Sequence, residues 1–240
     1  MRPEILFPLF APITSLKGVG ARVAPALEKV AGPIVRDVLF LQPHNLIRRR
    51  WATTATAMEE EIQLIRVTVD AHEKPAKVGW PWRIRCFDEA GFVTLAFFKG
   101  IGPHLAERHP KGSARIIGGK VERFGQELRM VHPDIWPADK TDIPEIEPVY
   151  PATANLPPRS VRRFALEALA RAPELPEWQD PAWVARERLP AWREALAALH
   201  APKSEADLAP QARHRRRLAF DELLAHQLAM AQRKQARRAE

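Results

Sequence analysis

The strongest constraint on the fold of this chain comes from the stretch between Trp82 and Gly100, WRIRCFDEAGFVTLAFFKG. Apolar and polar residues alternate on both sides of the turn sequence DEAG, which predicts two short strands joined as a hairpin. The first strand would carry Trp82, Ile84 and Cys86 on one face and Arg83, Arg85 and Phe87 on the other. A strand with this alternation has one face for a core and one face for solvent or a ligand.

The second strand of the hairpin indicates which side chains point away from the core. Its uniformly apolar set, which we expect to face the core, is Val93, Leu95 and Phe97. The alternate set, which would then point outward, is Thr94, Ala96 and Phe98.

An outward Phe98 next to Lys99, on the same hairpin as Arg83 and Arg85, has the composition of a surface on which nucleic-acid bases stack. Stacking one base on one aromatic ring contributes about 1–3 kcal/mol, and nearby cations add salt-dependent affinity. The alternative is that Phe98 is buried beneath residues 101–109, because a short apolar run does not by itself fix which face is covered.

Three further strands are expected around this hairpin. Alternation over residues 62–72 predicts one strand before it, and residues 114–124 and 127–132 predict two after it. Residues 101–109 form a short helix or loop between the third and fourth strands. Five short strands with this helical connection match an OB-fold barrel, which binds oligonucleotides on the face of its second and third strands. We therefore expect an α+β protein.

The first fifty residues hold two candidate anion-binding features. The run SLKGVG, with Lys17, Gly18 and Gly20, precedes a helical pattern and resembles the turn of helix-hairpin-helix DNA-binding motifs, in which backbone N–H groups hold a phosphate. The alternative is a glycine turn that lets two helices pack closely. Further on, Arg48 and Arg49 belong to a run of three arginines, of which one or two are expected to contact phosphate.

The chain divides by composition into four segments. We expect an N-terminal helical segment over 1–58, the barrel over 59–134, a proline-rich extended linker over 135–158 and a helical region over 159–240. The last helix carries Phe220, Leu224 and Leu228 along one side, which favours packing on a neighbour over DNA contact.

Charge favours a polyanionic partner. The chain has 37 Lys and Arg against 29 Asp and Glu, a net charge of +8. The alternative is a solvated basic surface.

Other features of the sequence exclude several classes of protein. The single cysteine, Cys86, excludes an internal disulfide and fits a reducing cytoplasm. No apolar run reaches the ~20 residues of a membrane span. The sequence has neither metal-ligand spacing nor a phosphate-binding loop, so we expect no metal or cofactor in the chain. We also expect no catalytic residue, because no paired carboxylates, nucleophile or metal set has the expected context.

Seven segments in order resemble the N-terminal part of the RecG family of bacterial ATP-dependent DNA helicases. They are SLKGVG, VRDVLFLQPHNLIRRR, VTLAFFKG, MVHPDI, EPVYPATANLPPRSVRRF, LPEWQDP and ARHRRRLAFDELLAHQLAM. In that family this region is a wedge domain, an OB-fold that docks on branched DNA and splits its strands while motor domains drive fork regression. The resemblance implies that Phe98 stacks on a base at the branch point.

This chain departs from the family at the same place. The family commonly has Asn at the position of Lys99, and often a second aromatic where this chain has Ile101 and Gly102. The helicase motifs that follow the long helix in the family are absent, so ATP and magnesium are expected only with motor domains that this chain lacks. The chain would then be a fragment, a truncated product or a stand-alone wedge.

Two partners fit this interpretation. The first is branched or single-stranded DNA, including replication forks and Holliday junctions in repair and recombination, bound by a monomer. The second is a protein, such as the acidic tail of single-stranded DNA-binding protein, because OB-folds also bind peptides.

Overall fold

The computed structural model describes residues 3–98, 102–125 and 127–239, which form two compact units. One unit, here the barrel unit, is Ile47–Ile146. The other, here the helical unit, combines Met1–Leu46 with Glu147–Glu240. Residues 59–134, where the sequence predicts a barrel, lie within the barrel unit. The two ends of the chain, for which the composition predicts separate helical segments, form one unit.

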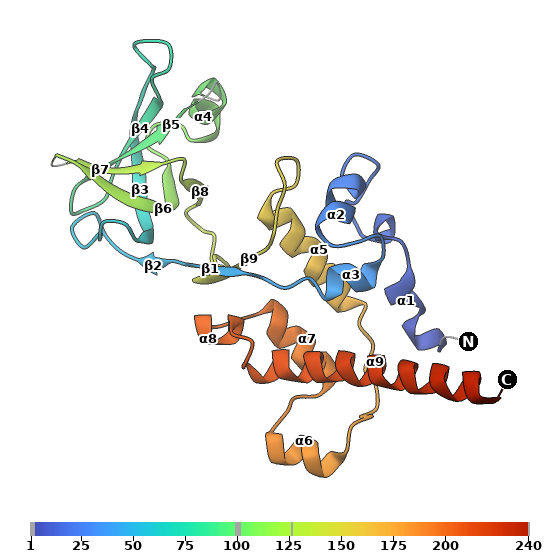
Figure 1. Ribbon diagram of the computed structural model, residues 1–240. Helices are drawn as coiled ribbons and strands as arrows, with labels where there is room; N and C mark the ends of the chain where they lie inside the picture. The colour runs from blue at the N-terminus through green and yellow to red at the C-terminus, as the bar shows by residue number, and fades with distance from the viewer. Residues whose placement is uncertain (1–2, 99–101, 126, 240) are drawn as a thin grey trace. The chain divides into compact units, whose positions relative to one another are not determined.

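The barrel unit is built from one sheet and a short helix (Figure 1). Its elements are β2 (Arg50–Trp51), β3 (Ile62–Glu73), β4 (Trp82–Phe87), β5 (Phe92–Phe97), α4 (Gly102–Arg108), β6 (Ala114–Phe124), β7 (Glu127–Val131) and β8 (Asp134–Pro137). The strands lie in the order β2-β3-β4-β5-β7-β6-β8, and β6 also pairs with β3. This last pairing closes five strands into a barrel, with β5 and β7 parallel and α4 between β5 and β6. The predicted OB-fold is therefore confirmed.

The interior of the barrel is the set of apolar positions that alternation predicts. Ile84 and Cys86 of β4 and Val93, Leu95 and Phe97 of β5 all belong to one buried cluster. Burial raises the pKa of the Cys86 thiol to about 12, so this cysteine is a core residue and not a nucleophile. The outward Ala96 is also buried, so the outer face of β5 is covered near its end.

A glycine pair in β6 has a packing role. A Cβ added at Gly118 would lie 2.6 Å from the Trp136 ring and 2.9 Å from Leu64. Any side chain at this position would therefore push β8 away from the barrel, and a Cβ at Gly119 would lie 3.1 Å from Pro133.

The helical unit contains short helices and one two-stranded sheet. Its elements are η1 (Glu4–Leu6), α1 (Phe7–Phe10), η2 (Ile13–Ser15), α2 (Ala24–Val30), α3 (Val35–Leu39), β1 (Asn45–Arg48), β9 (Ile146–Val149), α5 (Pro158–Ala170), α6 (Pro181–Glu187), α7 (Trp192–His200), α8 (Glu205–Leu208) and α9 (Arg213–Ala239). The strands β1 and β9 pair where the chain leaves and re-enters this unit.

The strands β1, β2, β8 and β9 were not predicted from sequence, which assigned these residues to a helical segment and an extended linker. Their sequences contain little alternation, and Pro137 and Pro148 lie in β8 and β9. Proline is tolerated there because these strands lie at sheet edges.

One hydrophobic core joins both ends of the chain. Leu27 of α2 and Val38 of α3 belong to the same buried cluster as Phe164 of α5 and Leu196 of α7. A buried chain of hydrogen bonds reinforces this junction. The His200 Nε2 donates to the Leu39 carbonyl oxygen at 2.7 Å, and its Nδ1 accepts from the Tyr150 hydroxyl at 2.7 Å. Burial lowers the pKa of His200, which keeps the ring in the neutral form that this arrangement requires.

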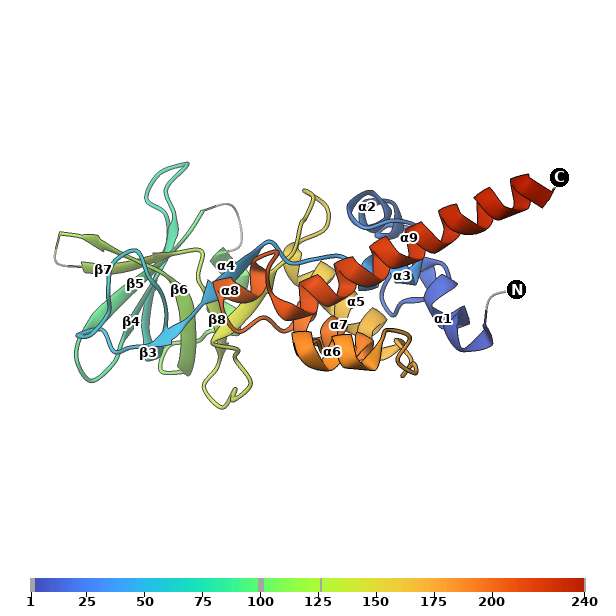
Figure 2. The same cartoon turned by 60° about the horizontal axis from the view of Figure 1, so that its bottom comes forward.

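A fully buried cation holds α9 in the helical unit, where α9 packs against α7 (Figure 2). The Arg217 guanidinium donates to both carboxylate oxygens of Glu177, at 2.6 and 2.9 Å, and to Asp221 at 2.8 Å. It also lies 5.1 Å from the Trp178 ring centroid. The hydrogen bonds from Arg217 lower the pKa of Glu177 despite partial burial.

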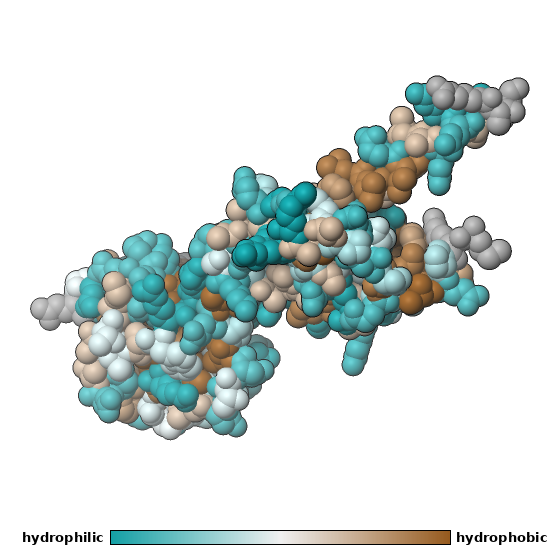
Figure 3. Space-filling model, turned by 90° about the horizontal axis from the view of Figure 1, so that it is seen from below, coloured by the Kyte–Doolittle hydropathy of each residue, from teal (hydrophilic) through white to brown (hydrophobic). Residues whose placement is uncertain are grey.

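The second half of α9 is uncovered. From Ala225 to Arg237 every side chain is exposed, including Leu228 and Met230, and Figure 3 shows an apolar patch along the protruding helix. Among the described residues, no helix combines the length and apolarity that crossing a bilayer requires.

Replacing Arg217 by Met should lower the free energy of unfolding by about 3 kcal/mol, measured by urea denaturation. The variant keeps the volume of the side chain but leaves Glu177 and Asp221 without their cation. The matched control is Arg216→Met, because Arg216 forms an exposed ion pair with Glu187 at 3.1 Å and should contribute less than about 1 kcal/mol.

Acid should also lower the free energy of unfolding, because it protonates the carboxylate that Arg217 binds. The lowered pKa of Glu177 stabilises the fold above the ordinary value of 4.5, and this stabilisation is lost as pH falls below it. The Arg217→Met variant should therefore lose less stability than the unmodified chain on acidification. Equal losses would contradict this assignment.

Candidate nucleic-acid interface

The outward face of β4 carries the two predicted cations. Arg83 and Arg85 are both exposed, and they pair across the sheet with Ala96 and Thr94 of β5. Arg85 is partly neutralised because its Nε lies 2.6 Å from the Asp70 carboxylate. It also lies 6.0 Å from the ring centroid of Phe92. This face therefore combines positive charge with an exposed aromatic ring.

Sequence reasoning did not assign a role to the aromatic pair at the hairpin turn. Phe87 and Phe92 are opposite each other in the register, and their ring centroids are 6.1 Å apart. Phe92 is 61% exposed and Phe87 is 37% exposed. The sequence does contain a signal for an outward Phe92, because the alternation that places Thr94 on the outer face of β5 also places Phe92 there.

Phe98 follows the last residue of β5 and is partly buried. Its ring centroid lies 5.9 Å from that of His132, which in turn contacts Phe97 edge-on at 5.8 Å. The Phe98 N–H donates to the His132 Nε2 at 3.4 Å, and the His132 N–H donates to the Ala96 carbonyl oxygen at 2.9 Å. Phe98 is thus held against the barrel on one side and is not the fully exposed tip that alternation predicts. Lys99 lies outside the described residues.

His132 has an unusual backbone conformation. Its φ is +48°, in the left-handed region that costs most non-glycine residues roughly 1–2 kcal/mol. The imidazole that contacts both Phe97 and Phe98 therefore comes from a strained position. Such strain persists only where the surrounding structure holds it in place.

The two candidate arginines after α3 have different environments. Arg48 is exposed at the end of β1. Arg49 is only 5% exposed. Its backbone N–H donates to the Glu145 carbonyl oxygen at 2.7 Å, and its side-chain Nη1 donates to the Pro144 carbonyl oxygen at 3.1 Å. Burial removes Arg49 from the candidate phosphate contacts, and its role is to hold residues 144–145.

The turn around Gly18 packs against α5. The Lys17 N–H donates to the Glu167 carboxylate at 2.8 Å, and Arg171 links that carboxylate to Ser15. An anion from the protein itself is therefore already at the amide where a phosphate would bind. In addition, α2 begins only at Ala24, four residues after Gly20. These contacts favour the packing alternative, and DNA contact by Lys17, Gly18 and Gly20 stays a prediction.

In the part of the chain that the structure describes, no group of three His, Cys, Asp or Glu side chains could hold a metal ion. The carboxylate of Asp88 accepts hydrogen bonds from Thr54, Ala90 and Gly91. Burial acts to raise its pKa, but these hydrogen bonds lower it, so Asp88 stays ionised and holds the hairpin turn.

Comparison with known proteins identifies one group of relatives. No protein-family model matches the chain. The chain is 28% identical to the ATP-dependent DNA helicase RecG of Acidithiobacillus ferridurans over 240 residues, covering 93% of this chain and 33% of that protein. It is 26% identical to the ATP-dependent DNA helicase RecG of Escherichia coli strain K12 over 241 residues, covering 91% and 33%. The chain therefore matches the N-terminal region of RecG helicases, and spans about a third of the length of these relatives.

The fold agrees with this match. A solved structure of RecG bound to a three-way DNA junction superposes with a TM-score of 0.73 at 20% identity, covering 95% of this chain and 31% of that chain. The likeness extends over both units and concerns the fold. The resemblance to RecG inferred from the sequence is confirmed.

Replacing Gly18 by Ala should lower the free energy of unfolding by about 1–2 kcal/mol. Gly18 has a φ of +87°, and a Cβ there would lie 3.1 Å from Arg163 Nη2. Gly20→Ala is the matched control, because Gly20 has no positive φ and open space at its Cβ. Thermal or urea unfolding measures both, and equal effects would contradict a packing role specific to Gly18.

Proposed function

We propose that this chain binds branched DNA through its barrel unit, and that Phe98 stacks on a base at the branch point. The observation that carries the proposal is the match to RecG over nine-tenths of the chain, in sequence and in fold, together with the three-way junction bound by the solved RecG. The net charge of +8 supports a polyanionic partner.

The contacts of Phe98 fit this task. An aromatic ring gains most from stacking on a base that has lost one of its own stacking neighbours, as at the point where two strands separate. Continuous duplex offers no such base. Because His132 supports one side of the Phe98 ring, less side-chain freedom is lost on binding. We infer a preference for forks and junctions over duplex.

The cations of the barrel unit supply affinity without sequence preference. Arg83 and Arg85 lie on the outer face of β4, where they would contact phosphates beside the branch. Because Arg85 is already paired with Asp70, Arg83 is expected to carry more of the salt dependence. ATP hydrolysis by a RecG-type helicase would then depend on regions of the relatives that this chain does not match.

Replacing Phe98 by Ala should weaken binding to a synthetic fork by about 5- to 150-fold, the equivalent of one lost stacking contact. Binding to continuous duplex of the same length should change little. Fluorescence anisotropy at fixed salt measures both.

The matched control is Phe7→Ala, because Phe7 is 53% exposed and lies in the helical unit. It should leave fork affinity unchanged. Equal affinity of the unmodified chain for fork and duplex, or no loss in the Phe98 variant, would refute the proposal.

His132 is proposed as a positioning residue for Phe98. Asn tolerates a positive φ, so His132→Asn should keep the backbone conformation while removing the ring contacts. We expect a several-fold loss of fork affinity, a smaller loss than for Phe98→Ala, and an unfolding free energy within about 1 kcal/mol of the unmodified chain.

The double variant separates positioning from independent contact. If His132 acts through Phe98, the His132→Asn change should cause no further loss in a Phe98→Ala background. A base analogue such as 2-aminopurine at the branch reports stacking directly. Additive losses would show that His132 contacts DNA by itself and would exclude the positioning role.

A further inference from the structure

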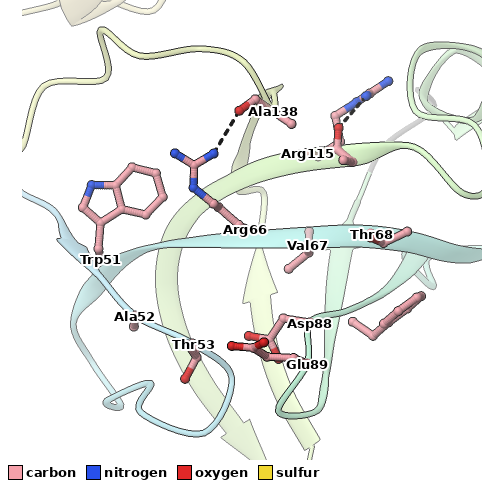
Figure 4. Close-up of a pocket in the computed structure, with 12 residues that line it drawn as sticks. Trp51, Ala52, Thr53, Arg66, Val67, Thr68, Asp88, Glu89, Arg115 and Ala138 are labelled. Carbon is pink, nitrogen blue, oxygen red and sulfur yellow. Dashed lines mark hydrogen bonds between the residues drawn. The ribbon is translucent and has the colours of Figure 1, made fainter.

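A groove of about 720 Å³ lies on the outer surface of the barrel unit, away from Phe98. We name it the Trp51 groove. Its polar and aromatic lining includes Trp51, Thr53, Arg66, Thr68, Glu89 and Arg115 (Figure 4). The groove lies beside Phe87, the last residue of β4. Phe98 lies near the other end of β4, because it follows Phe97, which pairs with Trp82. Five residue steps of about 3.4 Å place the two ends of β4 about 17 Å apart.

One wall of the groove is an aromatic ring beside a fixed guanidinium. Trp51 is 44% exposed, and the Arg66 guanidinium lies 5.0 Å from its ring centroid. Arg66 Nη1 donates to the Ala138 carbonyl oxygen at 3.0 Å, which holds the guanidinium beside the ring. Trp51 is fixed in turn by its pairing with Leu64 of β3. Planar surfaces of these two kinds are those on which bases stack.

Arg115 supplies a second positive charge across the groove. It donates to the carbonyl oxygens of Arg108 at 2.9 Å and Ala114 at 2.7 Å, and to His109 Nδ1 at 3.1 Å. Within the described residues, neither Arg66 nor Arg115 forms an ion pair with a carboxylate. Their positive charges are therefore available to an anion that enters the groove.

Two acidic residues, Asp88 and Glu89, line the groove and differ in how far they are available to offset the positive charge of Arg66 and Arg115. Asp88 is held by hydrogen bonds from Thr54, Ala90 and Gly91. Glu89 is exposed at the rim, so it is the carboxylate that an incoming phosphate would meet (Figure 4).

We propose that the Trp51 groove binds single-stranded DNA, with a base stacked on Trp51 beside Arg66 and phosphates near Arg66 and Arg115. The proposal rests on DNA being the partner, as proposed above, and adds a second contact for a strand that leaves the branch. One OB-fold takes about 4–16 nucleotides of single strand, so a groove at the other end of β4, a strand about 17 Å long, lies within reach of one bound strand. The exposed indole favours a base over a carboxylate-rich peptide, which would use the arginines alone.

The test compares two DNA probes that differ only in one arm. The first is a fork with a single-stranded arm, and the second is a three-way junction with all arms duplex. Trp51→Ala and Arg66→Gln should each weaken binding to the first probe by about 5-fold or more and leave the second within 2-fold, since the single strand is present only in the first. Trp51→Phe should retain most of the affinity.

The matched control is Trp80→Ala. Trp80 is 52% exposed and also has a cation near its ring, Lys77 at 5.9 Å, but it does not line the groove. It should not change the preference between the two probes. Glu89→Gln should strengthen binding to the probe with the single-stranded arm, because it removes the rim carboxylate. Unfolding free energies of all variants verify that they are folded.

The outcomes separate this inference from the proposed function. A loss for Phe98→Ala on both probes with no loss for Trp51→Ala overturns the groove alone. A loss for Trp51→Ala with none for Phe98→Ala overturns the branch-stacking role alone. Trp51→Ala could instead raise the Kd for an acidic peptide and leave DNA binding unchanged. That result would show that the groove binds a peptide and would overturn DNA as its ligand.

Discussion

Closure of the barrel by pairing of β3 with β6 is the constraint on which the candidate interface depends. Seven residue pairs, from Ile62 with Lys120 to Thr68 with Ala114, join the first and fourth barrel strands. Because the sheet closes, the side chains of each strand are sorted into an interior set and an exterior set. The exterior set includes Arg83, Arg85 and Phe92. Phe98 and the Trp51 groove lie at the ends of strands of this closed sheet, so its closure also determines their positions.

The helical unit depends on a different kind of constraint. Its core takes residues from both ends of the chain, so α2 and α3 have no complete core without α5 and α7. The His200 hydrogen bond to Leu39 joins the two ends, whereas the Arg217 contacts to Glu177 hold α9 within the C-terminal part of the unit. Buried polar groups of this kind are stabilising only when all of their partners are present, which ties both chain ends to one folding unit.

Much of the candidate site follows from alternation along single strands. The positions of Val93, Leu95 and Phe97 in the core, and of Arg83 and Arg85 outside it, are local properties with a period of two residues. The same period marks Phe92 as an outward aromatic. The environment of Phe98 could not be read in this way, because His132 is thirty-four residues away and reaches it through an uncommon backbone conformation.

The sequence by itself determined the order of the barrel strands, their inner and outer faces, the excess of positive charge and the resemblance to RecG. Only the tertiary structure decided which polar groups remain available to a ligand. It buried Arg49, paired the Lys17 amide with Glu167, 150 residues away, and brought Trp51, Arg66 and Arg115 around one groove. The physical reason is that alternation is set by neighbouring residues, whereas a partner for a charge or a ring comes from wherever the closed fold places one.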